Sequence, residues 1–351
     1  MSLENESVHK DLVAEELAEK SDDVDFTLRP KTLNEVIGQN EIKKELSISI
    51  MAAKKRNETL DHILFFGPPG LGKTTFASVV AHEMSADIKL TNGSSLIRTG
   101  DLAAILSSLN PGDVLFIDEI HRMPVPVQEV LYSAMEDYML SIIVGKGADA
   151  RTLTIPLPPF TLIGATTDAG NLSAPLRDRF GILLPMRYYS PEELLQIVMR
   201  TSQALRSPIA LDAAYQLALR GRGTPRIVNR LFRRVRDYAT YQGKTVIDKE
   251  ACEAAMSFLA IDDLGLDETD RKILECLIYR YKGKPVGLNA LASAIGASVD
   301  NIQDVYEPYL VQIGLINRTP KGRIATEKAY SHLGVPLPEG EEKSKKPSQQ
   351  G

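Results

Sequence analysis

The stretch GPPGLGKT at residues 67–74 constrains the fold of this 351-residue chain more than any other segment. It matches the pattern G-x-x-x-x-G-K-[ST], and it stands between an apolar run, HILFFG, and a helical run, TTFASVVAHEM. In this order of strand, loop and helix, successive backbone N–H groups point at one anion at the helix N-terminus. The motif therefore predicts a phosphate-binding loop within an α/β fold.

Each residue type in this loop has a chemical reason. Gly70 and Gly72 let the backbone bend around the anion, and Lys73 reaches the β- and γ-phosphate oxygens as a point charge. Thr74 offers its hydroxyl to Mg²⁺, and Thr75 is placed to donate to the α-phosphate region. A chance glycine-rich turn is the alternative, and the presence of strand, motif and helix together disfavours it.

Two further apolar runs end in polar residues. LFIDE places Asp118 at the end of a buried strand, where it can hold the water shell of Mg²⁺, and Glu119 follows to orient and deprotonate an attacking water. FTLIGATT ends in Thr167, which can hydrogen-bond the γ-phosphate or that water. Plain surface carboxylates and a simple strand-forming threonine are the alternatives. His121 is assigned no role, because a lone histidine is more often structural.

The elements change in kind along the chain. From about 26 to 185, short apolar runs alternate with helical stretches, which predicts a parallel sheet covered by helices. From about 187 to 260 three or four helices are expected, the first capped by Ser190. Three helices and a hairpin, LINRT-PKG-RIAT, then give the order of a winged helix-turn-helix. The expected domains are an acidic, disordered leader, a large domain, a small helical domain, a winged-helix domain and a disordered tail: 1–24, 25–186, 187–260, 261–335 and 336–351.

Composition excludes several classes of protein. The net charge is −5, so any basic surface for nucleic acid must be local. No apolar run approaches the roughly 18 residues that span a bilayer, and the acidic N-terminus lacks the order of a secretory signal. Cys252 and Cys276 have no metal spacing and predict buried, reduced thiols. We therefore expect a cytoplasmic protein without a membrane partner.

The segment APLRDRFG, residues 174–181, carries two arginines two positions apart. A guanidinium that stabilises charge on a γ-phosphoryl group is worth about 10³–10⁵ in rate. Pro175 and the following strand, FGILLPM, place the segment at the far edge of the sheet, away from the phosphate loop. The arginine is therefore expected to act on the next subunit's nucleotide, which requires a ring or filament. An ordinary surface arginine, or a salt bridge to Asp178, is the rival interpretation.

At this point a family resemblance emerges. GPPGLGKTT, LFIDEIHR, FTLIGATT and LRDRFG resemble the motifs of AAA+ ATPases, and four further stretches are similar to the RuvB family, bacterial motors of Holliday-junction branch migration: RPKTLNEVIGQ, YSAMEDY, GRGTPRIVNRLFRRVRDYA and RTPKGRIAT. The resemblance runs from about residue 26 to 335. It implies an AAA+ P-loop parallel-sheet domain, a small helical lid domain and a C-terminal winged-helix domain, with ATP and Mg²⁺ as cofactors.

The resemblance also implies roles for single residues. Arg179 matches the arginine finger, with Arg177 as a helper. Thr167 matches sensor 1, and Arg226 matches sensor 2, which touches the γ-phosphate of its own chain. The other positions that the family associates with nucleotide are Leu28 and Arg29, which bracket adenine and ribose, Tyr189, and the stretch Glu136, Asp137 and Tyr138.

Two segments are rich in basic residues, and the first is the candidate for DNA contact. Arg318, Lys321 and Arg323 cluster around a tight turn in which Gly322 takes a positive φ, so long cations can meet phosphates on both sides of a groove. No aromatic residue accompanies them, so binding is expected to be largely independent of sequence; a solvated hairpin tip is the alternative. The run 220–236 holds seven arginines. Apart from Arg226, these are expected at subunit contacts and solvated faces, not on DNA.

A hairpin is expected at 139–160, with Leu153 and Ile155 on an apolar face. If it projects, this face is a docking site. The family's counterpart binds RuvA, which holds the four-way junction open; a hairpin folded onto its own domain is the alternative.

The resemblance implies a homo-hexameric ring that pulls duplex DNA at four-way junctions with RuvA, and with RuvC in the resolving complex, during recombination and repair. A clamp-loader or initiator-like AAA+ switch that does not translocate is the second hypothesis, and the winged domain and the 139–160 insertion disfavour it. A third is a winged-helix regulator with a vestigial nucleotide site. The intact Lys73, Asp118 and Glu119 argue against that.

Overall fold

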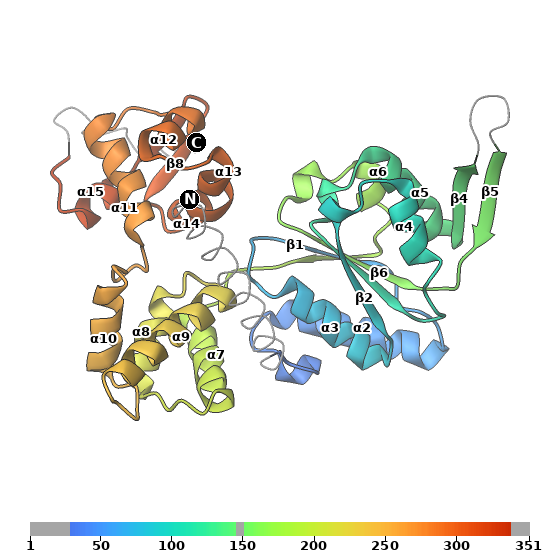
Figure 1. Ribbon diagram of the computed structural model, residues 1–351, viewed down its shortest axis with the longest axis horizontal. Coiled ribbons are helices and arrows are strands. Elements are labelled where there is room, and N and C mark those ends of the chain that lie inside the picture. Colours follow the sequence, from blue (N-terminus) through green and yellow to red (C-terminus); the bar gives the residue numbers. More distant parts are fainter. Residues whose placement is uncertain (1–28, 145–150, 338–351) are drawn as a thin grey trace, which may run out of the picture. The chain divides into compact units, whose positions relative to one another are not determined.

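The structure is a computed structural model that describes residues 29–144 and 151–337. Figure 1 colours the chain from its N-terminus to its C-terminus. The chain divides into two compact units. The first contains the residues up to Ser207 together with Gly223–Arg230, and the second contains Pro208–Arg222 and the residues from Leu231 onward. Leu28, the leader 1–24 and the tail from 338 lie outside the described residues.

The first unit is built on a five-stranded parallel sheet with the order β2-β3-β6-β1-β7. The strands are β1 (Ile63–Phe66), β2 (Ile88–Asn92), β3 (Val114–Asp118), β6 (Thr161–Thr166) and β7 (Ile182–Pro185). The three strands predicted from apolar runs are confirmed, and β6 lies between β3 and β1. The edge strand β2 was missed because none of its five residues is buried, so it has no apolar run.

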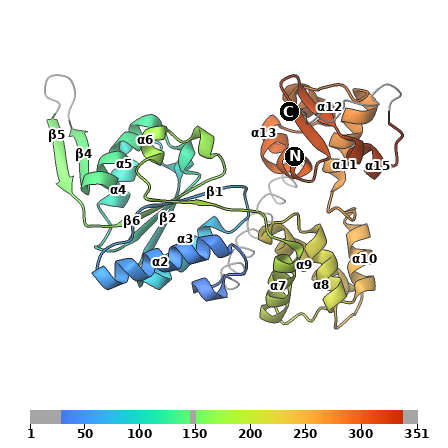
Figure 2. The same ribbon diagram turned by 180° about the vertical axis from the view of Figure 1, so that it is seen from behind.

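Helices cover both faces of this sheet. Figures 1 and 2 show α2 (Asn40–Arg56) and α3 (Lys73–Met84) on one face, with α4 (Thr99–Leu106) and α5 (Val125–Asp137) on the other. Leucines of α4 and α5 pack with the buried residues of β3 and β6 in one hydrophobic core. The α/β fold class is therefore confirmed.

The strand after APLRDRFG corrects one expectation. β7 is an edge strand, but it pairs directly with β1, which leads into the phosphate loop, so it does not lie at the edge far from that loop. The separation comes from strand direction instead. Ile182 pairs with Ile63 and Pro185 with Phe66, so Arg179 lies before the start of β7 while the loop follows the end of β1. The four residues of β1 alone span about 13 Å.

The predicted hairpin forms outside the main sheet. β4 (Met139–Val144) and β5 (Arg151–Pro156) are antiparallel, and they pair Leu140 with Ile155. The strand β4 packs against α5, and in Figures 1 and 2 β4 and β5 extend away from the main sheet of the first unit.

Helices dominate the next part of the chain: α7 (Pro191–Ala204), α8 (Leu211–Arg220), α9 (Pro225–Tyr241) and α10 (Lys249–Phe258). The cap predicted for α7 is confirmed. The Ser190 hydroxyl oxygen accepts from the Glu193 N–H, and the Glu193 carboxylate accepts from the Ser190 N–H. Within 29–144 and 151–337, no helix is long and apolar enough to cross a membrane.

The C-terminal part of the second unit has the winged-helix order. Helices α11 (Glu268–Glu275), α12 (Leu288–Ile295) and α14 (Glu307–Gln312) precede the hairpin of β8 (Ile316–Thr319) and β9 (Gly322–Ala325). Val286 forms an isolated antiparallel β-bridge with Arg323, on the side of β9 away from β8. A Cβ on Gly322 would lie 2.3 Å from the Val286 carbonyl oxygen, so this turn needs glycine for close approach as well as for its φ of +130°.

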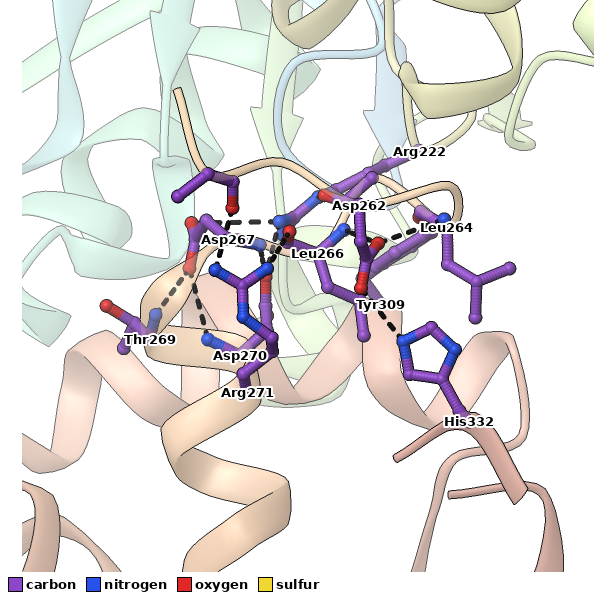
Figure 3. A network of polar contacts seen from close by, with 12 residues as sticks. Arg222, Asp262, Leu264, Leu266, Asp267, Thr269, Asp270, Arg271, Tyr309 and His332 are labelled. Atoms are coloured by element: carbon purple, nitrogen blue, oxygen red, sulfur yellow. Dashed lines mark hydrogen bonds and ion pairs between the residues drawn. The ribbon is translucent and has the colours of Figure 1, made fainter. Parts of the chain in front are cut away.

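A polar network joins the end of α8 to the start of α11 within the second unit (Figure 3). The Arg222 side chain donates to the Gly265 carbonyl oxygen at 2.8 Å, pairs with buried Asp270, and lies 5.0 Å from the ring centre of Tyr309. Tyr309 in turn donates to the Leu264 carbonyl oxygen at 2.6 Å. Arg220 and Arg222 were expected at subunit contacts or solvated faces; both are instead buried and hold the segment that leads into the winged domain.

Removing one partner of this buried ion pair is expected to destabilise the fold. Burial raises the pKa of Asp270 to about 6, so at neutral pH the carboxylate is charged and balances Arg222. Asp270→Ala removes the buried carboxylate and leaves Arg222 beside the more distant Asp267 carboxylate at 3.7 Å. We expect this to cost about 3 kcal/mol in the free energy of unfolding, the lower end of the range for breaking a buried pair. Urea unfolding at pH 7.5 measures this loss. Glu268→Ala, which breaks the exposed pair with Lys272 on the same helix, is the control and should cost less than about 1 kcal/mol. Equal losses for the two variants would contradict the assignment.

Candidate active site

The loop between β1 and α3 forms one wall of a cavity of about 190 Å³. Gly70 and Gly72 have φ of +78° and +103°, which only glycine adopts readily. A Cβ on Gly70 would also lie 2.7 Å from a methyl carbon of Thr224. The predicted residues that line the cavity are Arg29, Gly70, Gly72, Lys73, Thr74, Thr75, Asp118, Glu119, Tyr189 and Arg226. The fold therefore brings these ten positions together.

Lys73 is buried, with 7% of the residue exposed, and its ammonium group lies against the backbone of the phosphate loop. Its Nζ donates to the carbonyl oxygens of Gly67 and Pro68 at 2.8 and 3.0 Å. Burial lowers the pKa of Lys73, and the nearby Glu119 and Asp118 carboxylates oppose this. The charge is therefore kept beside the loop by carbonyl dipoles that a phosphate oxygen can replace.

The carboxyl ends of β3 and β6 place two carboxylates and a threonine side by side. Burial raises the pKa of Asp118, although Lys73 and the Glu119 N–H favour its charged form. The Glu119 Oε2 atom accepts from the Thr167 N–H at 3.2 Å and from the Thr167 hydroxyl at 3.0 Å. Thr167 is not among the residues that line the cavity, but it hydrogen-bonds the predicted base, which does line it.

The backbone of Glu119 is unusual. Its φ of 45° lies in the left-handed region, which costs energy for a residue with a side chain. Gly93 makes room for this turn, because a Cβ there would lie 2.4 Å from the Glu119 carbonyl oxygen. The chain therefore leaves the extended conformation of β3 at Glu119, and this turn costs conformational energy.

Tyr189 contacts the phosphate loop through its side chain. It is 7% exposed, its hydroxyl donates to the Leu71 carbonyl oxygen at 3.1 Å, and its N–H donates to Gly223. Burial raises the pKa of Tyr189 to about 12, so the hydroxyl stays protonated as a donor. On the same wall the Arg226 N–H lies 3.4 Å from the Gly70 carbonyl oxygen. The segment 223–226 thus packs directly on the phosphate loop.

Other predicted residues lie outside this cavity. Arg179 donates to the Pro175 carbonyl oxygen at 2.7 Å and to the Glu136 carboxylate at 2.9 Å, with its guanidinium 4.8 Å from the ring centre of Tyr132. The neighbour of Asp178 is Arg177, at 3.9 Å, and not Arg179. Glu136, Asp137 and Tyr138 end α5 and do not line the cavity of their own chain.

Sequence reasoning missed several residues at the cavity. Ile197 and Arg200 lie three positions apart on α7, and Asn229 lies on α9. The helical period after Ser190 puts Ile197 and Arg200 on one face, but nothing in the sequence says that this face meets the nucleotide loop.

The hairpin of β8 and β9 places Arg318 and Arg323 directly opposite each other. Like charges in this position repel, and a carboxylate offsets the repulsion. The side chain of Glu307, 1% exposed, accepts from Arg318 Nε at 2.5 Å and from Arg323 at 3.0 Å through both Nε and Nη2. Arg323 is therefore mostly engaged in the fold, whereas Arg318 stays half exposed and Lys321 is exposed at the turn.

The β4–β5 hairpin was expected either to project as a docking face or to fold onto its own domain, and its two apolar residues differ in this respect. Leu153 is 50% exposed, whereas Ile155 packs against the core of the first unit. Ile155 thus belongs to a base folded onto its own domain, and Leu153 remains on the surface. Gly145 and Gly147, which the sequence places between the two strands, lie outside the described residues.

Taken together, the phosphate loop, the Asp118–Glu119 pair on the next strand but one, and Thr167 on the strand between define a P-loop ATPase of the AAA+ class, which binds nucleotide at this loop. Three family models match consecutive parts of the chain: the Holliday junction DNA helicase RuvB P-loop domain (28–186), the RuvB AAA lid domain (189–262) and the RuvB C-terminal winged helix domain (263–334).

Curated relatives match nearly the whole chain. The Holliday junction branch migration complex subunit RuvB of Oenococcus oeni is 55% identical over 336 residues, 96% of this chain and 99% of that one. The subunit of the same name from Leuconostoc mesenteroides is 55% identical over 310 residues, 88% of each chain. The solved Thermotoga maritima RuvB Holliday junction branch migration motor is 51% identical, with a TM-score of 0.81 over 89% of this chain and 100% of that one. The chain belongs to the RuvB family.

The Tyr189 hydroxyl is expected to contribute to nucleotide affinity. Tyr189→Phe leaves the Leu71 carbonyl oxygen without its donor and loosens the loop, so ATP affinity should fall about fivefold, equivalent to about 1 kcal/mol. Titration with a fluorescent ATP analogue measures it. Tyr188→Phe, the same change in the half-buried neighbour that packs against Gly223, is the control. Unchanged affinity in the Tyr189 variant would remove this role.

Proposed function

We propose that this chain is an ATP-driven DNA motor that moves the branch point of Holliday junctions in recombination and repair. One observation carries the proposal: Lys73, Asp118 and Glu119 meet at one edge of the sheet, in a chain that also holds a winged-helix domain. The names of the relatives support the choice of DNA substrate.

The site residues suit ATP with Mg²⁺. The Thr74 hydroxyl and the Asp118 carboxylate are hard oxygen donors on the same cavity wall, as Mg²⁺ prefers, and Lys73 is the cation for the β- and γ-phosphates. When bound, Mg²⁺ neutralises charge on the phosphate oxygens. The loop amides and Thr75 hold the phosphates, Arg226 reaches the γ-phosphate, and Tyr189, Leu28 and Arg29 border the nucleoside.

Glu119 is the general base. Its carboxylate lines the cavity, and Thr167 fixes it through two hydrogen bonds. Glu119 orients a water for in-line attack and takes its proton, and Thr167 holds the base or the γ-phosphate in register.

Arg179 is the arginine finger for a neighbouring subunit. It lies at the start of β7, opposite the end of the sheet that carries its own phosphate loop, so it completes a site on another copy. The C-terminal end of α5 lies beside this arginine, and we propose that its residues contact the same neighbouring nucleotide: Glu136, Asp137 and Tyr138. Repetition of this heterologous contact closes a ring, for which we propose a hexamer.

The winged domain contacts DNA through its hairpin. Arg318 and Lys321 supply the exposed charges, and Arg323 assists through the pair with Glu307. Contacts of this kind bind phosphates and so follow DNA of any sequence.

The remaining assignments follow from the family. The exposed part of the β4–β5 hairpin, with Leu153 and to a lesser degree Ile155, docks RuvA, and RuvC joins in the resolving complex. The protein acts in the cytoplasm, and its domains are those expected from the sequence, 25–186, 187–260 and 261–335. The alternative, a switch that does not translocate, lacks a use for the projecting hairpin.

A synthetic four-way junction tests the motor directly. With RuvA and ATP, the full-length chain should convert the junction into two duplexes, and the wild-type chain with a non-hydrolysable ATP analogue should not. Gel electrophoresis of labelled arms measures the products. ATP consumption that is stimulated by the junction but leaves it intact would instead support the non-translocating switch.

Removing the exposed wing charges should weaken DNA binding about equally for all sequences. For Arg318→Ala with Lys321→Ala, each lost phosphate contact should lower the slope of log affinity against log salt by about 1. Fluorescence anisotropy with two unrelated duplexes measures this. Lys249→Ala with Lys272→Ala, which removes two exposed cations on α10 and α11, is the charge-matched control. A loss confined to one duplex would indicate base readout.

A further inference from the structure

His121 lies against the proposed base, although its position in the sequence suggested no role. It belongs to the short helical turn Ile120–Arg122 that follows β3, and its side chain is 14% exposed. Its Nδ1 atom is 2.8 Å from the Thr166 hydroxyl and 3.3 Å from the Glu119 Oε2 atom. The imidazole thus bridges the ends of β3 and β6.

The neighbours of Nδ1 determine which nitrogen carries hydrogen. The Thr166 hydroxyl is fully buried and accepts from the Asp168 N–H at 3.0 Å, so its place is fixed. A lone pair on Nδ1 would face the Glu119 carboxylate at short range, which is repulsive. We therefore assign a hydrogen to Nδ1, donated to the Thr166 hydroxyl, which also turns the positive side of this N–H dipole toward the Glu119 Oε2 atom 3.3 Å away.

These contacts make the two oxygens of the Glu119 carboxylate unequal. Oε2 has three neighbours: the Thr167 N–H, the Thr167 hydroxyl and His121 Nδ1. Within 29–144 and 151–337, Oε1 has no hydrogen-bond partner. An oxygen that accepts several hydrogen bonds is a weaker proton acceptor than one that accepts none. The arrangement therefore leaves Oε1 as the oxygen suited to receive a proton from water.

We propose that His121 is a positioning residue for ATP hydrolysis: with Thr167 it holds Oε2 of Glu119, so that Oε1 is presented to the attacking water. This rests on the proposed role of Glu119 as general base. The strained backbone of Glu119 and its close packing on Gly93 fix the Cα, so the orientation of the carboxylate depends on the groups that hold its far end.

Two substitutions of equal polarity separate positioning from folding. In asparagine the amide nitrogen is bonded to Cγ, as Nδ1 is in histidine, whereas in glutamine it lies one bond further out, near the place of Nε2. His121→Gln should lower kcat about tenfold or more with KM for ATP changed less than about twofold, because orientation at the reacting centre is lost and binding is not. His121→Asn should restore most of that turnover.

The measurement is steady-state ATP hydrolysis by the full-length chain with duplex DNA, with thermal unfolding of each variant alongside. Equal kcat for the asparagine and glutamine variants, at any level, would overturn the proposal, as would a change in KM alone. A second pair checks the anchor of the imidazole: Thr166→Val should match the loss in the glutamine variant, and Thr166→Ser should not.

Glu119→Gln keeps this test apart from the proposed function. If Glu119→Gln retains ATP but cannot hydrolyse it, the general base stands, and the His121 variants decide the positioning role by themselves. If Glu119→Gln hydrolyses ATP normally, the general-base assignment fails, and the positioning role fails with it.

Discussion

The direction of the strands in one parallel sheet governs the chemistry of this protein. β1, β3 and β6 end at the same side of the sheet. Glu119 and Thr167 directly follow β3 and β6, and Lys73 begins α3 after the loop that follows β1. Because β7 runs parallel to β1, Arg179, which precedes β7, lies at the side of the sheet where the strands begin, opposite the side where they end. A chain built in this way holds the binding groups and the proposed base of one site, and the guanidinium that we propose for another. The proposed ring follows from that separation.

The segment from Arg220 to Arg226 shows how one basic run serves two separate structures. Arg226 lines the nucleotide cavity, and its neighbour Thr224 packs on Gly70. Arg222, four residues earlier, is buried among carbonyl and carboxylate groups at the start of the winged domain. Each guanidinium is placed by the groups that satisfy it, and a count of arginines does not reveal which groups those are.

Much of the fold was predictable because its signals are local. Buried strands β1, β3 and β6 are apolar runs, α7 starts with a capping box, and Gly322 marks the wing turn. The strand β2 was not predictable, because an edge strand of partly exposed residues has no such run. The place of β7 beside β1 depends on long-range pairing, which sequence spacing does not encode.

The site was predictable where a residue acts through a motif, and not where it acts through a neighbour. Lys73, Asp118 and Glu119 were found from spacing and strand position. His121, Arg200 and Glu307 were not, since each matters only for what another chain segment brings to it. Glu307 in particular changes the interpretation of the wing, because it engages Arg323 and leaves Arg318 and Lys321 as the exposed charges.

Mixing of two inactive variants tests the central claim, that one chain completes the site of the next. Arg179→Ala subunits keep the nucleotide cavity, and Lys73→Ala subunits keep the finger. Each alone should be inactive, but in a mixture the Lys73→Ala chain can supply its arginine to an intact cavity, so DNA-stimulated ATP hydrolysis should reappear and peak at intermediate ratios. No recovery at any ratio, or full hydrolysis by the Arg179→Ala chain alone, would contradict the account.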